Sequence, residues 1–374
     1  LGDVYKRQVG GGGTPFAIQN ILPVLFNMPI KNYFIATLIG STPSMFVTVA
    51  LGSGLESIID QNEQISFFKA NGYLLVPGIM DKQLCSELQD RMWESLPENA
   101  SLKREISATH TGPFASDLRS AESTHFRDGY RWLNRTLGVT ESAIQLIYSE
   151  KICEIARQLI GGDLRQAVVG GTPMGANGPA WPGGPTDPAL GTEGARGVYF
   201  TLPYGDKPRE PDLCHTDGHP FQLGVVGLIA DTPQDGGAFK IWPGYLKSFF
   251  SKFVHGYDQP RIPYYDHLPA FKGIRHTPEY LEEIVRLNKE VRAVECWGNR
   301  GDLVFWHHRT AHMAGHNYSN TIREAILADF WNDELNENRA KPSSDEMWDD
   351  WSNEVKNSSE EYSKEFAKQQ RLEV

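Results

Sequence analysis

Short apolar segments separated by glycine- and proline-rich turns dominate the second half of this chain. Their composition is strand-like in five runs, at residues 198–202, 223–230, 238–242, 303–307 and 324–330. Turn signals such as Asp235-Gly236-Gly237 and Pro243-Gly244 lie between them. Short strands punctuated in this way, with helical patterns gathered nearer the N-terminal side, predict a mainly β fold with α additions. The expected core is a double-stranded β-helix of the jelly-roll or cupin-like type.

Two helical patterns and one long loop precede these strands. Asp81 is the expected N-cap of a helix whose apolar stripe holds Leu84, Leu88 and Met92. Residues 144–160 form the second amphipathic pattern. Residues 170–197 are rich in Gly and Pro, which predicts a long loop. Loops of this length inside a compact domain are usually functional or disordered, so a substrate rim or lid and plain disorder both stay open.

The first 60 residues differ in composition from everything after them. Residues 1–8 lack hydrophobic periodicity, and we interpret them as a cloning or assembly scar. From Val9 to Leu55 the only charged residue is Lys31, and the uncharged run at residues 32–55 is long enough to cross a bilayer. Gly40-Ser41-Thr42-Pro43-Ser44 interrupts that run, which favours a re-entrant or broken helix.

Within this segment, residues 29–40, Pro43 and residues 51–55 resemble a characteristic part of the DedA/TVP38-type membrane proteins, and the resemblance spans about residues 9–58. Only a fraction of such a domain is covered. We therefore interpret residues 1–60 as a scar plus an apolar membrane-like segment, joined by a chimeric gene model to a soluble domain at residues 61–374. A genuine membrane-protein fragment fused to that domain, with membrane association through residues 9–55, is one alternative. A buried apolar hairpin of the soluble domain is another.

Charge and cysteine usage narrow the class of the soluble domain. The formal net charge is −11, and residues 331–374 hold 12 acidic and 6 basic residues, which is typical of a solvated helical surface. A chain this acidic lacks the basic surface that binding to nucleic-acid phosphates requires, so we expect no nucleic-acid partner. The four cysteines contain no C-x-x-C pair, which favours a reducing, cytoplasmic compartment over a disulfide framework or zinc ribbon. Nothing in the composition indicates an oligomeric state.

His215-Thr216-Asp217 form an H-x-D triplet. Alternate residues of a strand share a face, so His215 and Asp217 could ligate one ion. Two imidazoles and one carboxylate are the facial ligand set of iron(II), which leaves room for a 2-oxo acid and dioxygen. Alone the triplet is weak, because with 11 histidines it arises by chance in roughly half of such chains. His219 is a competing ligand, and His215 as a core histidine is the structural alternative.

The second half of such a site has several candidates. The possible third ligands crowd one stretch and are His307, His308, His312 and His316. Arg323 follows, and a guanidinium deep in a barrel needs an anionic partner. The distal carboxylate of 2-oxoglutarate, gripped by both arms of the guanidinium, would supply one. Glu324 would lie on the other face of the strand. A surface arginine on an edge strand is the alternative.

Taken together, three ordered motifs resemble the phytanoyl-CoA dioxygenase family over about residues 65–332: the H-x-D triplet, the turn Asp235–Ala238 leading to Pro243-Gly244, and Gly301–Trp306 followed by His312 and Arg323. The resemblance implies a double-stranded β-helix that uses Fe(II), 2-oxoglutarate and O2, and that hydroxylates a C–H bond while 2-oxoglutarate becomes succinate and CO2. By position it implies that His215, Asp217 and His312 are the metal ligands and catalytic set, and that Arg323 binds the distal carboxylate. The spacing of eleven residues before Arg323 selects His312.

The chain departs from the family pattern at three places. Ala314 stands where a hydroxyl residue often helps the arginine, Gly227-Leu228 where an aromatic residue is common, and Tyr245-Leu246 where Ser-His is usual. Asp217 is intact, and since family members that halogenate lack this carboxylate, the resemblance implies hydroxylation. Tyr199 and Thr201 are candidate contacts of the 2-oxo acid. The candidate pocket-lining residues are Trp306, Phe305, Trp242 and His219.

Two other functions remain open at this point. One is a non-catalytic cupin-like protein that holds a metal without turnover. The other is a membrane protein whose function lies in the N-terminal segment. For an enzyme the expected partner is a small-molecule substrate. The sequence does not identify this substrate, and it contains no clear basic cluster that would bind the phosphates of CoA.

Overall fold

The computed structural model describes residues 62–98, 100–114, 123–126, 129–171, 194–217, 221–252, 257, 278–342 and 344–373. Glu63–Val374 form one compact unit. The scar-like and membrane-like segments lie outside the described residues, so their origin stays a prediction, and most of the Gly/Pro-rich loop lies outside them too. In the part of the chain that the structure describes, no helix has the length and apolar character of a membrane span.

Two antiparallel sheets form the core. The larger sheet has its strands in the order β1 (Tyr73–Val76), β8 (Leu303–His307), β5 (Leu223–Leu228), β10 (Arg323–Phe330), β4 (Gly197–Thr201), β3 (Arg131–Asn134) and β2 (Ser123–Phe126). The smaller sheet has the order β7 (Val294–Cys296), β6 (Phe239–Ile241) and β9 (His312–Ala314). An isolated antiparallel bridge between His215 and His312 adds one more position beside β9.

The chain alternates between these sheets in the manner of a double-stranded β-helix. In chain order, β4, β5, β8 and β10 lie in the larger sheet, whereas residue 215, β6, β7 and β9 lie in the smaller one. The sheet orders are therefore β4-β10-β5-β8 and 215-β9-β6-β7. The two sheets pack through aromatic side chains, for example Trp306 of β8 and Phe239 of β6, whose ring centroids are 4.7 Å apart. This topology confirms the predicted fold.

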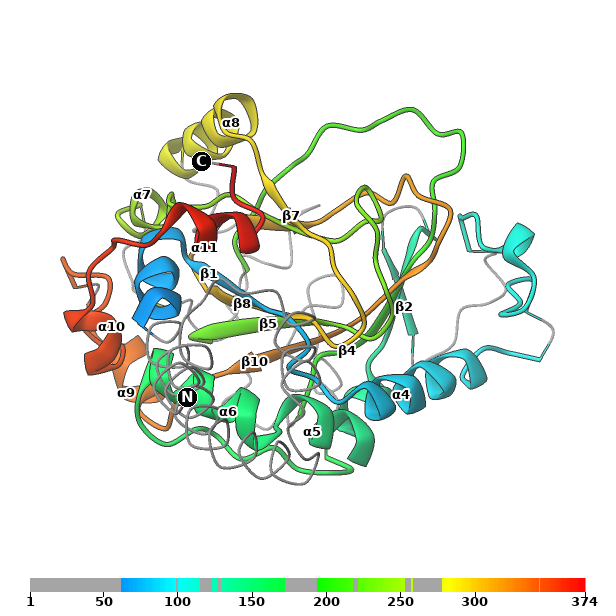
Figure 1. Ribbon diagram of the computed structural model, residues 1–374, viewed down its shortest axis with the longest axis horizontal. Helices are drawn as coiled ribbons and strands as arrows, with labels where there is room; N and C mark the ends of the chain where they lie inside the picture. The colour runs from blue at the N-terminus through cyan, green and yellow to red at the C-terminus, as the bar shows by residue number, and fades with distance from the viewer. Residues whose placement is uncertain are drawn as a thin grey trace, which may run out of the picture. The chain divides into compact units, whose positions relative to one another are not determined.

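Helices lie along the outer side of the larger sheet (Figure 1). They include α4 (Lys82–Glu94), α5 (Glu141–Ile147) and α6 (Glu150–Ile160). Asp81 caps α4 as predicted, because its Oδ1 accepts from the main-chain N–H groups of Gln83 and Leu84 at 2.8 and 2.9 Å. On α4, Trp93 packs against Phe200 on the outer face of β4 at 4.8 Å. Contacts of this kind bury the side of the sheet that faces away from the smaller sheet.

The single helix expected at residues 144–160 is wrong. The chain leaves the helical conformation at Tyr148 and Ser149, where Ser149 is the N-cap of α6 in an extended conformation. Tyr148 packs on Phe330 at the end of β10, with ring centroids 5.0 Å apart. The break between the two helices thus coincides with the residue that packs this segment against the sheet.

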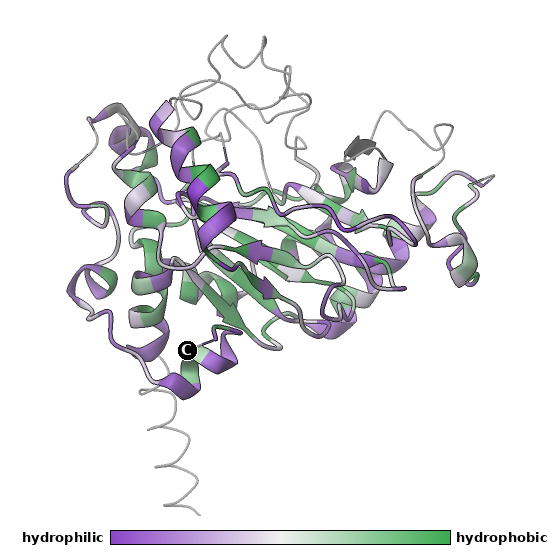
Figure 2. Cartoon of the chain, turned by 90° about the horizontal axis from the view of Figure 1, so that it is seen from above, coloured by the Kyte–Doolittle hydropathy of each residue, from purple (hydrophilic) through white to green (hydrophobic). Residues whose placement is uncertain are grey.

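The remaining helices include residues 62–71, α7 (Leu246–Phe250), α8 (Pro278–Glu290), α9 (Leu335–Ala340), α10 (Asn353–Asn357) and α11 (Lys364–Gln369), with 3-10 turns at Ser107–Thr109 and Thr136–Val139. Figure 2 shows hydrophobic residues concentrated in the strands, with hydrophilic residues interleaved along the helices. The acidic C-terminal region is helical in part, as predicted. It is not simply a solvated surface, because Trp348, Trp351 and Phe366 are buried in the core.

Candidate metal centre

His215, Asp217 and His312 come together and form what we call the triad. One ligand atom from each lies within 4.8 Å of the other two, and among the described residues this is the one such group that could hold a metal ion. The Oδ1 atom of Asp217 is 3.5 Å from Nε2 of His312 and 3.8 Å from Nε2 of His215. Asp217 and His312 are buried, and His215 is half-buried. The donor set is that of a facial iron(II) site.

The main chain places the two imidazoles. His215 and His312 pair across the antiparallel bridge, and their ring centroids are 4.7 Å apart. The Nδ1–H of His312 donates to the main-chain carbonyl of Thr310 at 2.8 Å, which turns Nε2 towards Asp217. The expected strand at the H-x-D triplet is wrong in detail. His215 makes a single bridge and no regular strand continues to Asp217, so other contacts must orient that carboxylate.

A cavity of about 720 Å³ opens beside the triad. The larger sheet contributes Tyr199, Val226, Trp306, Arg323 and Leu327 to its wall, and the smaller sheet contributes Phe239, Met313 and Ala314. We call it the triad cavity. Its lining combines apolar side chains with a few charged groups, as is usual for small-molecule sites.

Arg323 lies at the start of β10 and is 1% exposed. In the sheet register it is the partner of Thr201, which in turn pairs with Arg131 of β3. Thr201 is fully buried, and its hydroxyl has no hydrogen-bond partner among the residues that the structure describes. The predicted residues Arg323 and Tyr199 therefore line the triad cavity, and Thr201 is next to Arg323 in the ladder.

The other histidines of the second stretch lie in different surroundings. The ring of His307 stacks on Trp351 at 4.6 Å, and burial lowers its pKa well below the usual value. His308 stacks on Tyr257 at 4.5 Å. His316 lines the triad cavity but does not belong to the triad. His312 is thus the histidine of this stretch that meets His215 and Asp217.

Of the residues expected to line the pocket, some line the triad cavity and others do not. Trp306 lines the triad cavity. Phe305 and Trp242 do not: Phe305 belongs to the main core, and Trp242 packs in a separate cluster with Cys214 and Phe249. His219 lies outside the described residues. Strand alternation explains the division of the neighbours Phe305 and Trp306, since adjacent side chains of β8 point to opposite faces.

Two functional candidates were missed by sequence reasoning. Arg131 lines the triad cavity with its guanidinium over the ring of Tyr199 at 4.8 Å, and burial lowers its pKa. Arg196 lines the cavity and bonds Asp217. The weak signal for Arg196 was its place near the end of the loop predicted at residues 170–197, two residues before the predicted strand at residues 198–202. β3, which carries Arg131, was not predicted at all.

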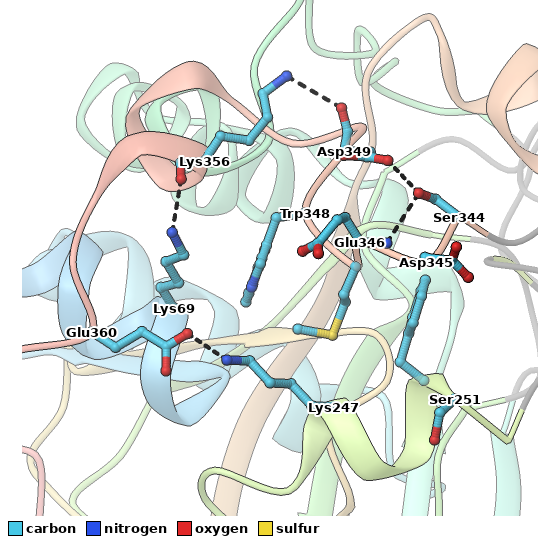
Figure 3. Close-up of a pocket in the computed structure, with 12 residues that line it drawn as sticks. Lys69, Lys247, Ser251, Ser344, Asp345, Glu346, Trp348, Asp349, Lys356 and Glu360 are labelled. Atoms are coloured by element: carbon cyan, nitrogen blue, oxygen red, sulfur yellow. Dashed lines mark hydrogen bonds and ion pairs between the residues drawn. The ribbon is translucent and has the colours of Figure 1, made fainter.

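A second cavity, of about 780 Å³, is lined by charged residues (Figure 3). Lys247 pairs there with Glu360, and Lys69 donates to the main-chain carbonyls of Lys356 and Ser358, both at 2.8 Å. Lys356 in turn donates to the carbonyl of Asp349 at 3.2 Å. These contacts tie the C-terminal segment to the domain, so we assign this cavity a structural role.

No family model matches the sequence, and no curated protein matches it. Several solved structures are similar to it. The non-heme alpha ketoglutarate dependent carbocyclase SnoK from nogalamycin biosynthesis is 16% identical, with 75% of this chain and 92% of that chain covered and a TM-score of 0.45. The epimerase SnoN in complex with Fe3+, alpha ketoglutarate and nogalamycin RO is 17% identical, covers 74% and 84%, and has a TM-score of 0.42. EctD from S. alaskensis with bound Fe is 14% identical, covers 72% and 75%, and has a TM-score of 0.41.

Proposed function

We propose that this protein is an Fe(II)- and 2-oxoglutarate-dependent dioxygenase that hydroxylates a small organic substrate and converts 2-oxoglutarate to succinate and CO2. One observation carries the proposal: the triad, with ligand atoms within 4.8 Å of one another, shares a cavity with the buried guanidinium of Arg323. The ordered motifs that resemble the phytanoyl-CoA dioxygenase family support it, and membership of that family is part of the proposal.

The triad fits a divalent iron ion. Two neutral imidazoles and one carboxylate hold iron(II) on one face and leave other positions to ligands that are not protein. His312 is prepared for this role because its Nδ1–H is engaged by the carbonyl of Thr310, so Nε2 carries the lone pair. With 2-oxoglutarate and O2, the bound metal supplies the oxidation.

The opposite wall of the cavity fits the distal carboxylate of 2-oxoglutarate. Arg323 offers a planar guanidinium, which binds a carboxylate through two parallel hydrogen bonds. On the neighbouring strand, Thr201 pairs with Arg323, and its buried hydroxyl has no hydrogen-bond partner among the described residues, so we assign it as a further candidate contact of that carboxylate. Tyr199 lines the same wall and is a candidate contact of the 2-oxo acid. These side chains would orient the cosubstrate along the cavity.

The chain also gives the triad cavity an apolar lining. Val226, Phe239, Trp306 and Leu327 line the cavity, where they would exclude water from a bound metal and strengthen the electrostatic contacts inside. A substrate C–H bond must be held near the metal for hydroxylation, and these side chains provide an apolar surface for that purpose. We assign the substrate as a small organic molecule.

Anaerobic titration with Fe(II), followed by 2-oxoglutarate, tests the site. We expect the full chain to bind both, His312→Ala to lose Fe(II) binding, and Arg323→Met to keep Fe(II) but lose 2-oxoglutarate. His308→Ala is the matched control, since His308 stacks on Tyr257 rather than joining the triad. If His312→Ala binds Fe(II) like the wild type and His308→Ala does not, the ligand assignment is wrong.

Turnover tests the reaction itself. Under air, with Fe(II), 2-oxoglutarate and a broad panel of small molecules, we expect succinate to form and one panel member to gain a hydroxyl group. A protein that binds Fe(II) and 2-oxoglutarate but forms no succinate would be a non-catalytic metal-binding protein. Succinate with a product that is not hydroxylated would keep the enzyme class and overturn hydroxylation.

A further inference from the structure

One guanidinium and two carboxylates form a buried cluster beside the triad. Arg196 donates from Nη2 to Oδ2 of Asp217 at 2.8 Å and to Oδ1 of Asp329 at 2.6 Å. Its Nε donates to Oδ2 of Asp329 at 2.8 Å. The three side chains are 11%, 5% and 2% exposed. We call Arg196, Asp217 and Asp329 the arginine cluster.

The planar guanidinium makes this arrangement directional. Asp329 occupies Nε and one hydrogen of Nη2, as a two-pronged carboxylate contact does. The second hydrogen of Nη2 is then aimed at Oδ2 of Asp217. Because that oxygen is engaged, Oδ1 is the atom that faces the Nε2 atoms of His312 and His215, at 3.5 and 3.8 Å. The hydrogen bond from Arg196 to Oδ2 therefore accounts for Oδ1 being the oxygen of Asp217 that faces the metal position.

Further contacts hold Arg196 in place without any help from a metal. Its guanidinium lies over the rings of Phe221 and Trp306, at 5.2 and 5.9 Å from their centroids. Its main-chain N–H donates to the carbonyl of Leu327 at 2.7 Å. Leu327 and Asp329 alternate along β10 with Arg323, so one face of one strand carries both the anchor of Arg196 and the expected cosubstrate contact.

Charge favours the same arrangement. Burial alone lowers the pKa of Arg196, but the carboxylates of Asp217 and Asp329 outweigh it and raise that pKa above its usual value. The cluster thus carries one positive and two negative charges. Without the guanidinium, the buried carboxylates of Asp217 and Asp329 would lose the cation that they share.

We propose that Arg196 is a positioning residue, which restricts Asp217 to coordination of the metal through Oδ1 alone, and that Asp329 fixes Arg196 for this purpose. The inference rests on the proposed function in that Asp217 is taken as a metal ligand. Coordination through one oxygen would leave room beside Asp217 for 2-oxoglutarate and O2. Neither Arg196 nor Asp329 would touch the metal.

Binding of Co(II) to the full chain tests this inference, since Co(II) reports its ligand geometry by its visible absorption. We expect Asp329→Asn and Arg196→Gln to bind Co(II) about tenfold to a hundredfold more weakly than the wild type, as typical for the loss of a partner of a ligand. We also expect their Co(II) absorption spectra to change. Arg196→Lys keeps the positive charge but lacks the planar set of guanidinium donors. It should therefore bind Co(II) more tightly than Arg196→Gln, though still more weakly than the wild type, and its spectrum should remain altered.

Arg300→Gln is the matched control. Arg300 also bonds through Nε, Nη1 and Nη2, to Ile229, Ser86 and Gln89, but it does not line the triad cavity. It should lose thermal stability and keep the Co(II) affinity and spectrum. If Arg196→Gln and Asp329→Asn behave like this control, the cluster is only structural and the inference is overturned while the proposed function stands. A wild type that binds neither Co(II) nor Fe(II) overturns both.

Discussion

His215 and His312 are main-chain partners, although 97 residues separate them in the sequence. The N–H of His215 donates to the carbonyl of His312 at 3.0 Å, and the N–H of His312 returns a bond to the carbonyl of His215 at 2.9 Å. Directly opposed residues of an antiparallel pair present their side chains on the same face. The imidazoles are therefore brought together by backbone hydrogen bonds, and the site is organised before a metal binds.

This relationship predicts that metal binding adds to the stability of a chain that is already folded. At an Fe(II) concentration 100-fold above its Kd, the free energy of unfolding of the wild type should rise by about 2.7 kcal/mol. His312→Ala should keep the far-ultraviolet circular dichroism spectrum and gain nothing from Fe(II). Anaerobic thermal unfolding with and without Fe(II) measures both. An equal gain in His312→Ala would place the metal elsewhere.

Much of the larger sheet could be predicted from local pattern. β8 occupies residues 303–307 as expected, because an apolar run there follows a Gly-containing turn. β6 was predicted although it has only three residues, because turn signals bound the apolar run at residues 238–242 on both sides. β7 and β9 are equally short and were missed, since no pair of turn signals bounds them. β9 matters most, because it begins at His312 and pairs with β6. Its place in the smaller sheet follows from tertiary pairing.

The candidate site, like the fold, could be predicted from the sequence only in part. Residue type was enough to make His215, Asp217 and Arg323 candidates, together with four histidines of the second stretch, and the family resemblance selected His312 among these. The arginine cluster was not predictable, because Arg196 and Asp329 are 133 residues apart and neither belongs to a spacing motif. Asp329 lay inside a predicted strand on the same face as Arg323, but nothing in the local sequence indicated which side chain it would contact there. Contacts that orient a ligand depend on the packed fold, whereas the ligand itself can be recognised by chemistry.

Thr201→Val should separate cosubstrate binding from stability. Valine keeps the shape and removes the buried hydroxyl that has no partner among the described residues, so stability should stay the same or rise slightly. If that hydroxyl donates to a carboxylate of 2-oxoglutarate, the Kd for 2-oxoglutarate should rise about tenfold or more. Anaerobic titration with Fe(II) present measures it. Thr232→Val, a buried threonine that neither lines the triad cavity nor pairs with Arg323, is the control, and equal Kd values in both variants would exclude Thr201 from the cosubstrate site.

Glu324→Gln should remove a pH dependence of stability. Burial raises the pKa of Glu324 to about 7, although hydrogen bonds from Gln89 and Trp93 oppose the shift. Below pH 4.5, the ordinary value, the folded and unfolded chains both hold this proton. Between about 4.5 and 7 the unfolded chain loses it first, so rising pH destabilises the fold by up to about 1.4 kcal/mol per pH unit.

The glutamine variant should therefore gain stability over the wild type across that pH window, by roughly 3 kcal/mol at most, and keep a constant advantage above it. Urea unfolding at a series of pH values measures the difference. Glu87→Gln on the exposed face of α4 controls for the loss of one charge. A difference between Glu324→Gln and the wild type that does not change between pH 4.5 and 7 would contradict the shifted pKa.

Gln370→Ala should destabilise the edge of the larger sheet. β1 is the edge strand beside β8, and the Gln370 side chain pairs with its backbone as another strand would: Oε1 accepts from the N–H of Leu75 at 2.6 Å, and Nε2 donates to the Leu75 carbonyl at 3.0 Å. Alanine would leave both buried groups unpaired, at a cost of about 1–3 kcal/mol each. Gln369→Ala, exposed on α11, should cost less than about 0.5 kcal/mol. Urea unfolding compares the two. Because the triad cavity is lined from β4, β5, β8 and β10 but not from β1, Gln370→Ala should still bind Fe(II) with wild-type affinity under conditions where it is folded.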